Sequence, residues 1–202
     1  AGVRYYKNKQ IEDAVSPYDN LFCEGVYVDG IPLGGMTWEQ AWNSVQSQIQ
    51  QRNDAWSVLL TYQGETVAEI NAKMLGMSVD IDSVMNKAWA QGHVGDKEQR
   101  YEAMTALLET HYEDYTASPS GDTSVIDGVL SDLKSQIEKP AVNAYLIDFD
   151  PSLAYPFTFS PEEYGTSLDV TQVRETLYHM VSTMTGGSVE LIPEAIEPPV
   201  KV

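Results

Sequence analysis

Two short stretches near the start of the chain alternate apolar and polar positions, the pattern of half-buried β-strands. Residues 25–33 alternate around Asp29-Gly30, a pair that supplies the positive φ angles of a tight turn. Residues 56–62 and 66–70 alternate on either side of Gln63-Gly64-Glu65. We therefore predict an antiparallel hairpin in each stretch.

Five other stretches repeat their apolar residues every three or four positions, which predicts amphipathic helices. The first stretch carries Thr37 and Gln40 at the spacing of a capping box. The expected helices cover residues 37–51, 96–115 and 123–137, a segment that follows Asp80 and stops at Gly92, and a segment that follows Asp169 and stops at Gly186-Gly187.

The period returns to two in the last third of the chain, which predicts three more strands. They are residues 142–149 and 155–159, joined by an Asp150-Pro151 turn, and residues 188–192. Two copies of one local pattern stand out. Residues 75–81 align with residues 164–170, and each copy follows a hairpin and opens a helix.

The repeat predicts the same backbone chemistry in both copies. A glycine recurs at Gly76 and Gly165, where we expect a positive φ angle. An aspartate recurs at Asp80 and Asp169, where a carboxylate can cap a helix N-terminus. We therefore interpret both aspartates as N-caps and not as ligand-binding residues.

Together these elements predict an α+β fold made of two related lobes joined by a helical segment. The expected single domain covers residues 21–193, with lobe one at 21–95, the helical segment at 96–139 and lobe two at 140–193. Residues 1–20 keep no apolar period and are expected to be a tether. Residues 194–202, which contain Pro198-Pro199, are expected to be a linker to a further domain.

Charge narrows the range of partners. The 202 residues include 30 acidic and 12 basic side chains, which give a net charge of −18 at pH 7. Such a protein repels phosphate backbones and anionic lipid headgroups, so we expect no nucleic-acid partner. The chain has no run of eighteen apolar residues, and its three histidines, His93, His111 and His179, are scattered. We therefore expect no membrane span, no metal site and no cofactor.

The cysteine and the acidic residues form no recognisable catalytic motif in the sequence. Cys23 is the single cysteine, and it lies among apolar residues beside Glu24, a setting that favours a buried thiol over a nucleophile. Neighbouring carboxylates are frequent because the chain is acidic. Asp148 and Asp150 lie on one face of a strand end and could touch Ca²⁺, but the chain lacks a calcium-binding loop pattern. We assign no catalytic, cofactor or metal residue.

Most aromatic residues fall on the apolar faces of their elements and are expected in the core. This group comprises Trp38, Trp42, Trp89, Tyr155, Phe157 and Phe159. Tyr164 and Tyr178 lie off these stripes. They are therefore better candidates for stacking against sugar rings.

Three motifs, in this order, resemble the peptidoglycan-binding domain of Gram-positive surface proteins, which precedes VanW-type and L,D-transpeptidase domains. They are GVYVDGIPLGGMT at 25–37 with Glu39-Gln40-Ala41, KPAVNA at 139–144, and FSPEEYG at 159–165 with Leu168-Asp169. The resemblance spans residues 21–200. It implies an extracytoplasmic protein at the cell surface or wall, held to the membrane by an N-terminal anchor outside this sequence.

We therefore expect a non-enzymatic module that binds cell-wall peptidoglycan and positions a neighbouring domain. A structural spacer or protein-interaction domain without glycan affinity is the alternative, and an uncharacterised hydrolase is a third. Because wall polymers are largely anionic, we expect binding by aromatic stacking and hydrogen bonds, with bridging divalent cations as the competing mode. The sequence assigns no ligand-binding residue and no oligomeric state.

Overall fold

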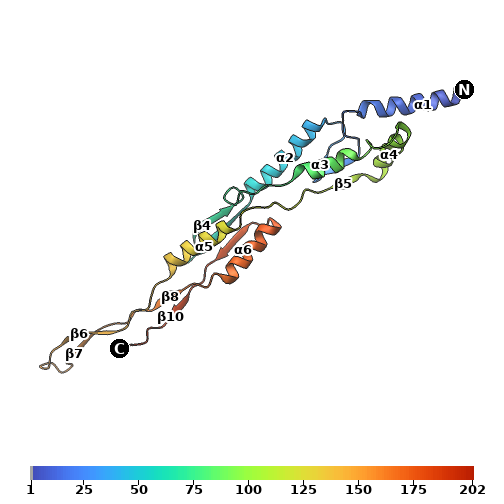
Figure 1. The fold of residues 1–202 in the computed structure, drawn as a ribbon. Helices are drawn as coiled ribbons and strands as arrows, with labels where there is room; N and C mark the ends of the chain where they lie inside the picture. The colour runs from blue at the N-terminus through green and yellow to red at the C-terminus, as the bar shows by residue number, and fades with distance from the viewer. Residues whose placement is uncertain (1) are drawn as a thin grey trace. The chain divides into compact units, whose positions relative to one another are not determined.

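The computed structural model describes residues 2–202 as a mixed α+β protein, which confirms the predicted fold class (Figure 1). The chain divides into two compact units. Unit 1 contains the residues up to 55 together with residues 77–120, and unit 2 contains residues 56–76 and 121–202. Each unit is therefore built from two separate stretches of the sequence, whereas each predicted lobe was one continuous stretch.

Unit 1 combines four α-helices and one 3-10 helix with a small sheet. Its elements are α1 (Gly2–Val15), the 3-10 helix η1 (Ser16–Tyr18), β1 (Val26–Val28), β2 (Ile31–Pro32), α2 (Trp38–Ala55), α3 (Ile81–Ala90), α4 (Lys97–Thr110) and β5 (Tyr112–Asp114). The sheet has the order β2-β1-β5, with β1 antiparallel to β2 and parallel to β5. The hairpin predicted around Asp29-Gly30 is confirmed, since both residues have positive φ angles of 49° and 76°.

The core of unit 1 is built around the buried stripe of α2. Ala41, Val45 and Ile49 are buried at a spacing of four residues, as the pattern predicted. Thr37 and Gln40 cap the helix reciprocally: the Gln40 N–H donates to the Thr37 hydroxyl at 3.2 Å, and the Thr37 N–H donates to the Gln40 side chain at 2.9 Å. The capping box is therefore confirmed.

Aromatic rings pack beside this stripe. Phe22 is fully buried, stacks on Trp38 at 5.9 Å between ring centroids, and meets Trp89 edge-on at 4.9 Å. Trp42 also packs against the core, and its indole N–H donates to Asp82 at 3.0 Å. The prediction that Trp38, Trp42 and Trp89 belong to the core is confirmed.

Unit 2 combines two helices with small antiparallel and mixed sheets. Its elements are β3 (Ser57–Tyr62), β4 (Glu65–Asn71), α5 (Ser124–Ile137), β6 (Tyr145–Phe149), β7 (Phe157–Ser160), β8 (Gly165–Ser167), α6 (Thr171–Thr183), β9 (Gly187–Glu190) and β10 (Glu194–Ile196). The main sheet has the order β4-β3-β9, and β8 pairs with β10. The predicted hairpin of β3 and β4 is confirmed, but its parallel pairing with β9 places it in unit 2 and not in a first lobe.

Both ends of the described chain are more ordered than the sequence predicted. The expected tether contains α1 and η1, and α1 buries Ile11 and Val15. Two apolar residues four positions apart are too few to predict a helix from the sequence. The helix is stabilised by packing against α4, where the Lys7 ammonium pairs with the Glu98 carboxylate at 2.6 Å. The expected linker contains β10, and the Val200 N–H donates to the Asn143 side chain at 3.1 Å.

The helix expected over residues 96–115 ends early. His111 has a φ of 48°, which stops α4, and β5 follows as a strand. Residues 112–114 continue the apolar spacing of a helix, but they pair with β1 as a parallel strand. In this strand Tyr112 packs against the core of unit 1, and this tertiary contact outweighs the local helical pattern.

The two copies of the predicted repeat differ in backbone geometry. Asp80 is the N-cap of α3, and its carboxylate accepts from the Ser83 N–H at 3.2 Å, as predicted. Asp169 lies one residue before the N-cap of α6 and accepts from the Thr171 N–H at 2.9 Å. The prediction of an N-cap at Asp169 is therefore wrong by one position.

The glycines of the repeat serve different purposes. Gly76 has a positive φ of 58°, as predicted. Gly165 lies instead in β8, where an added Cβ would come within 2.5 Å of both the Ala141 nitrogen and the Lys139 oxygen. Gly165 is therefore required by close backbone approach and not by a left-handed conformation.

Candidate functional site

The hairpin of β6 and β7 places four apolar side chains on one face. Leu146 pairs with Phe159 and Phe149 pairs with Phe157, and a register shift between Leu146 and Asp148 keeps these pairs on the same side. We call these four residues, Leu146, Phe149, Phe157 and Phe159, the aromatic face. The Phe149 and Phe157 ring centroids are 4.8 Å apart, and those of Phe157 and Phe159 are 6.3 Å apart.

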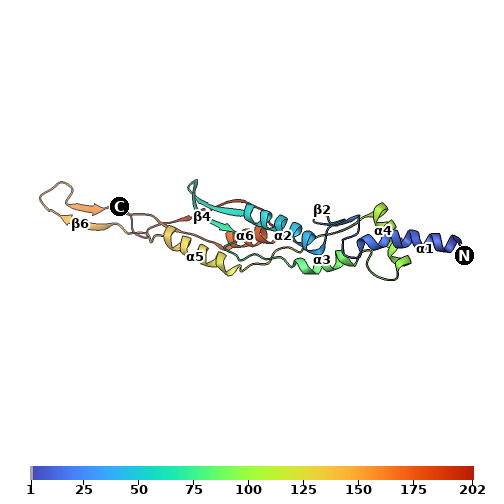
Figure 2. The same ribbon diagram turned by 90° about the horizontal axis from the view of Figure 1, so that it is seen from above.

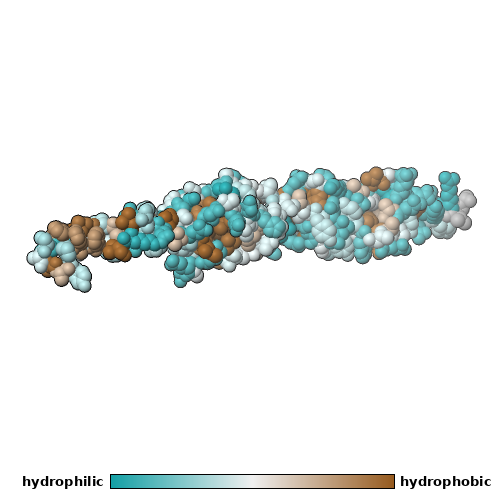
Figure 3. Space-filling view, turned by 90° about the horizontal axis from the view of Figure 1, so that it is seen from below, coloured by the Kyte–Doolittle hydropathy of each residue, from teal (hydrophilic) through white to brown (hydrophobic). Residues whose placement is uncertain are grey.

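The aromatic face is open to solvent. Phe149, Phe157 and Phe159 are 51%, 55% and 46% exposed, and Tyr155 at the hairpin loop is 88% exposed. The views in Figures 1 and 2 agree that the hairpin extends away from α5 and α6, with neither helix above it. Figure 3 shows brown side chains gathered over this hairpin, at the left end of the view.

The prediction that Tyr155, Phe157 and Phe159 belong to the core is therefore wrong. A period of two identifies residues that share a face, but it does not reveal whether another layer covers that face. A two-stranded ribbon buries neither of its faces unless a helix or second sheet packs on it. The sequence pattern here correctly predicted a strand at β7, but it carried no information on whether a helix or second sheet would cover it.

The two tyrosines that the sequence suggested for sugar stacking, Tyr164 and Tyr178, each contact a side chain of this protein. Tyr164 is exposed, and the Lys201 ammonium lies 5.5 Å from its ring centroid. Tyr178 is half-buried on α6, and its hydroxyl donates to Asp127 on α5 at 3.2 Å. Tyr178 therefore joins two helices, and only Tyr164 retains an exposed ring.

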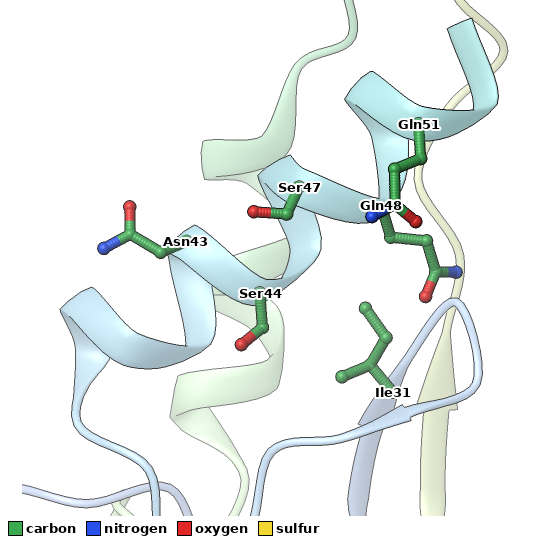
Figure 4. A pocket seen from close by; sticks show the side chains of 6 residues that line it. All are labelled: Ile31, Asn43, Ser44, Ser47, Gln48 and Gln51. Atoms are coloured by element: carbon green, nitrogen blue, oxygen red, sulfur yellow. The ribbon is translucent and has the colours of Figure 1, made fainter. Parts of the chain in front are cut away.

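A groove of about 440 Å³ lies on unit 1 between the outer surface of α2 and strand β2 (Figure 4). Its lining is uncharged and mostly polar. We call these six residues the amide groove: Ile31, Asn43, Ser44, Ser47, Gln48 and Gln51. Figure 4 shows their side chains along one side of the helix, with Ile31 facing them from the strand.

The buried stripe of α2 determines where these side chains lie. Asn43, Ser47 and Gln51 recur every four residues and are exposed, on the face of α2 opposite the stripe that packs into the core. The Gln48 amide donates to the Asp29 carbonyl at 3.0 Å and so ties the β1–β2 turn to the helix. The groove therefore has a fixed wall and a row of free polar groups.

Sequence analysis did not identify the groove as a site, because its lining contains no charged or metal-binding side chain. The available signal was compositional. Residues 40–51 contain no Asp, Glu, Lys or Arg, in a chain with 30 acidic side chains.

Cys23 lies away from solvent in the core of unit 1, as predicted. Burial, opposed by Arg100 and assisted by Glu24, raises the pKa of its thiol to about 11. At neutral pH the side chain is therefore a protonated, inaccessible thiol, which is a poor nucleophile.

Asp148 and Asp150 are occupied by local hydrogen bonds. Asp148 accepts from the Phe149 N–H, and Asp150 accepts from both the hydroxyl and the N–H of Ser152. These two bonds, the hydroxyl's first, lower the pKa of the Asp150 carboxyl. Among the residues that the structure describes, no group of three or more His, Cys, Asp or Glu side chains is arranged to hold a metal ion.

Within residues 2–202, no helix combines the length and the apolar character that crossing a bilayer requires. The fold and these surfaces define a small α+β protein with an exposed aromatic ribbon and an uncharged polar groove. Residues 68–190 match the family model described as "Putative peptidoglycan binding domain". The match covers more than half of the chain, and the chain belongs to this family. No curated protein and no solved structure matches the chain significantly.

The family match includes the whole aromatic face and leaves out the whole amide groove. Family membership associates the chain with the cell wall. It assigns no binding residue.

Proposed function

We propose that the chain is a non-catalytic module that binds peptidoglycan through the aromatic face of the β6–β7 hairpin. The observation that carries this proposal is the exposure of three phenylalanine rings on one face within the family-matched residues. Exposed aromatic rings present flat apolar surfaces on which the C–H faces of sugar rings can pack. A soluble protein rarely leaves such a patch uncovered unless it binds something.

Short-range contacts fit the charge of the protein better than ionic attraction does. At a net charge of −18 the protein is repelled by anionic stem peptides and teichoic acids over about 8 Å at physiological salt. Stacking and hydrogen bonding are insensitive to this repulsion once salt screens it. The module would therefore favour the glycan strand over the charged substituents.

The state of the candidate nucleophile supports a role without catalysis. The buried Cys23 thiol with its raised pKa is unsuited to acyl transfer. The Asp150 carboxylate accepts hydrogen bonds from the Ser152 hydroxyl and N–H, which lower its pKa and make it unsuited to act as a general acid.

In the envelope, such a module would act outside the cytoplasm and hold a neighbouring domain near its polymer. A membrane anchor outside the present sequence would limit its reach. The competing role is a spacer or protein-interaction domain, which would have no affinity for glycan.

Co-sedimentation with insoluble wall sacculi tests the proposal. The 202-residue protein would be mixed with sacculi across a series of NaCl concentrations, with and without a chelator. We expect binding that stays constant or strengthens with salt and survives the chelator. Loss of binding on chelation would indicate bridging cations, and no sedimentation under any condition would favour the spacer.

A further inference from the structure

We propose that the amide groove is a second binding site, which takes the uncharged N-acetylated sugars of a glycan strand. The choice of a glycan rests on the proposed function, whereas the location rests on unit 1 alone. The groove lies outside the family-matched residues 68–190. It is therefore a site that family membership does not assign.

The first argument is charge. Residues 40–51 carry no charged side chain, and the nearest charged residues along α2 are Glu39 and Arg52, at the two ends of this stretch. An anionic ligand would find no cation in the groove and would meet the negative field of the protein. An uncharged ligand meets no such barrier.

The second argument is hydrogen-bonding chemistry. The amides of Asn43, Gln48 and Gln51 each donate and accept, and the Ser44 and Ser47 hydroxyls do the same. Sugar hydroxyls and acetamido groups also donate and accept, so they match such a surface without burying a charge. Among the hydrogen bonds of the described residues, none engages the side chains of Asn43, Ser47 or Gln51.

The third argument is shape. Ile31 is the single apolar side chain of the groove and faces the row of polar groups from strand β2 (Figure 4). An acetamido group has an apolar methyl beside its polar amide, so Ile31 gives the methyl a contact while the amide reaches the helix. A plain hydroxyl at the same sugar carbon would leave that contact unmade.

The fourth argument is that one wall of the groove is held in place. The Gln48 amide holds the Asp29 carbonyl, and the capping box fixes the start of α2 at Thr37. The Gln48 amide and the backbone of this wall therefore need no ordering when a ligand binds, which reduces the entropic cost of binding to that of the remaining side chains.

The test is an NMR titration of the isotopically labelled 202-residue protein with chitotetraose, a soluble tetramer of N-acetylglucosamine. Cellotetraose, which has hydroxyls in place of the acetamido groups, is the matched ligand control. We expect chitotetraose to shift the amide signals of Ile31 and residues 43–51, and cellotetraose to shift them weakly or not at all. Equal shifts from both sugars, or no shift at these positions, would overturn the inference.

A charge variant separates binding from folding. Ser47→Glu places a carboxylate in the groove, and Ser135→Glu places one on the exposed surface of α5 in unit 2. With native amide dispersion in both spectra, we expect Ser47→Glu to weaken chitotetraose binding about tenfold and Ser135→Glu to leave it unchanged. Equal affinity in both variants would contradict the groove as the site.

Sacculi distinguish this inference from the proposed function. If the wild-type protein sediments with sacculi but chitotetraose leaves the groove signals unmoved, the proposed function stands and the inference fails. If the wild-type protein does not sediment, the proposed function fails and takes with it the inference that the groove serves wall glycan.

Discussion

Aromatic residues with similar sequence patterns are buried in unit 1 but exposed in the β6–β7 hairpin of unit 2. In unit 1, Phe22 is fully buried and contacts both Trp38 and Trp89. In unit 2, Phe149 and Phe157 contact each other just as closely, but half of each side chain faces solvent. The contacts within each cluster are alike, and the difference lies in whether a second layer covers them.

This difference separates stability from function. Burying an aromatic ring stabilises the fold, whereas a ring that stays exposed in the folded state contributes little of its transfer free energy. The buried rings of unit 1 therefore stabilise its fold. The rings of the hairpin are available for a ligand, and substitutions should affect the two clusters in different measurements.

The largest effect is expected from truncating the two clusters. Phe22→Ala would leave a cavity in unit 1 and lower the free energy of unfolding by about 3–5 kcal/mol. Phe157→Ala removes a half-exposed ring and should cost less than about 1 kcal/mol. Urea unfolding followed by circular dichroism measures both, and comparable losses would show that the hairpin face is part of a core.

The two glycines of the apparent repeat should respond next most strongly. Gly165→Ala forces main-chain atoms apart in β8, because the Cβ would lie 2.5 Å from the Ala141 nitrogen and the Lys139 oxygen. We expect a loss of about 2 kcal/mol or more, in the range of overpacking. Gly76→Ala meets no atom within 4 Å and should cost only the left-handed backbone penalty of about 1 kcal/mol. Thermal unfolding of the pair checks the order, and a milder effect at Gly165 would refute it.

A smaller contrast is expected at the two aspartates. Asp80→Ala removes an N-cap of α3 and should cost about 1 kcal/mol. Asp169→Ala removes a hydrogen bond one residue before the cap of α6 and should cost less. Urea midpoints of both variants measure the difference, and equal losses would restore the predicted equivalence.

The last effect is absent at neutral pH and develops only at alkaline pH. The buried Cys23 thiol has its pKa raised to about 11, above the value of about 8.5 for an exposed thiol. A raised pKa contributes stability that is present below about pH 8.5 and is lost as the pH rises toward 11. Cys23→Ala should therefore flatten the alkaline fall of the unfolding free energy between pH 8 and 10.

Iodoacetamide labelling of the native protein at pH 8 gives an independent check on the same thiol. We expect labelling to need denaturant. Rapid modification without denaturant would contradict the burial of Cys23.

The sequence predicted the local elements well where one physical cause acts alone. The Asp29-Gly30 turn, the capping box at Thr37 and Gln40, and the Asp80 cap depend on residues a few positions apart. Helix α1 was missed because its two buried residues contribute only once α4 packs against them. The exchange of the β3–β4 hairpin into unit 2 depends on β9, more than a hundred residues away.

The candidate surfaces were harder to predict than the elements. Phe157 and Phe159 of the aromatic face were predicted to belong to the core, because solvent exposure depends on neighbouring layers, which the residues of β6 and β7 do not encode. The amide groove was passed over because its chemistry is defined by the absence of charge. Solvent exposure and shape are properties of the folded protein, so neither surface could be recognised before the fold was known.

The central claim is that the hairpin rings bind wall polymer by stacking. Phe149→Tyr with Phe157→Tyr keeps two aromatic rings, whereas Phe149→Leu with Phe157→Leu keeps apolar side chains without rings. Sacculi co-sedimentation of these two double variants, matched for melting temperature, tests the claim most directly. We predict near-wild-type binding by the tyrosine variant and about tenfold weaker binding by the leucine variant. Equal binding by both variants would contradict stacking as the basis of recognition.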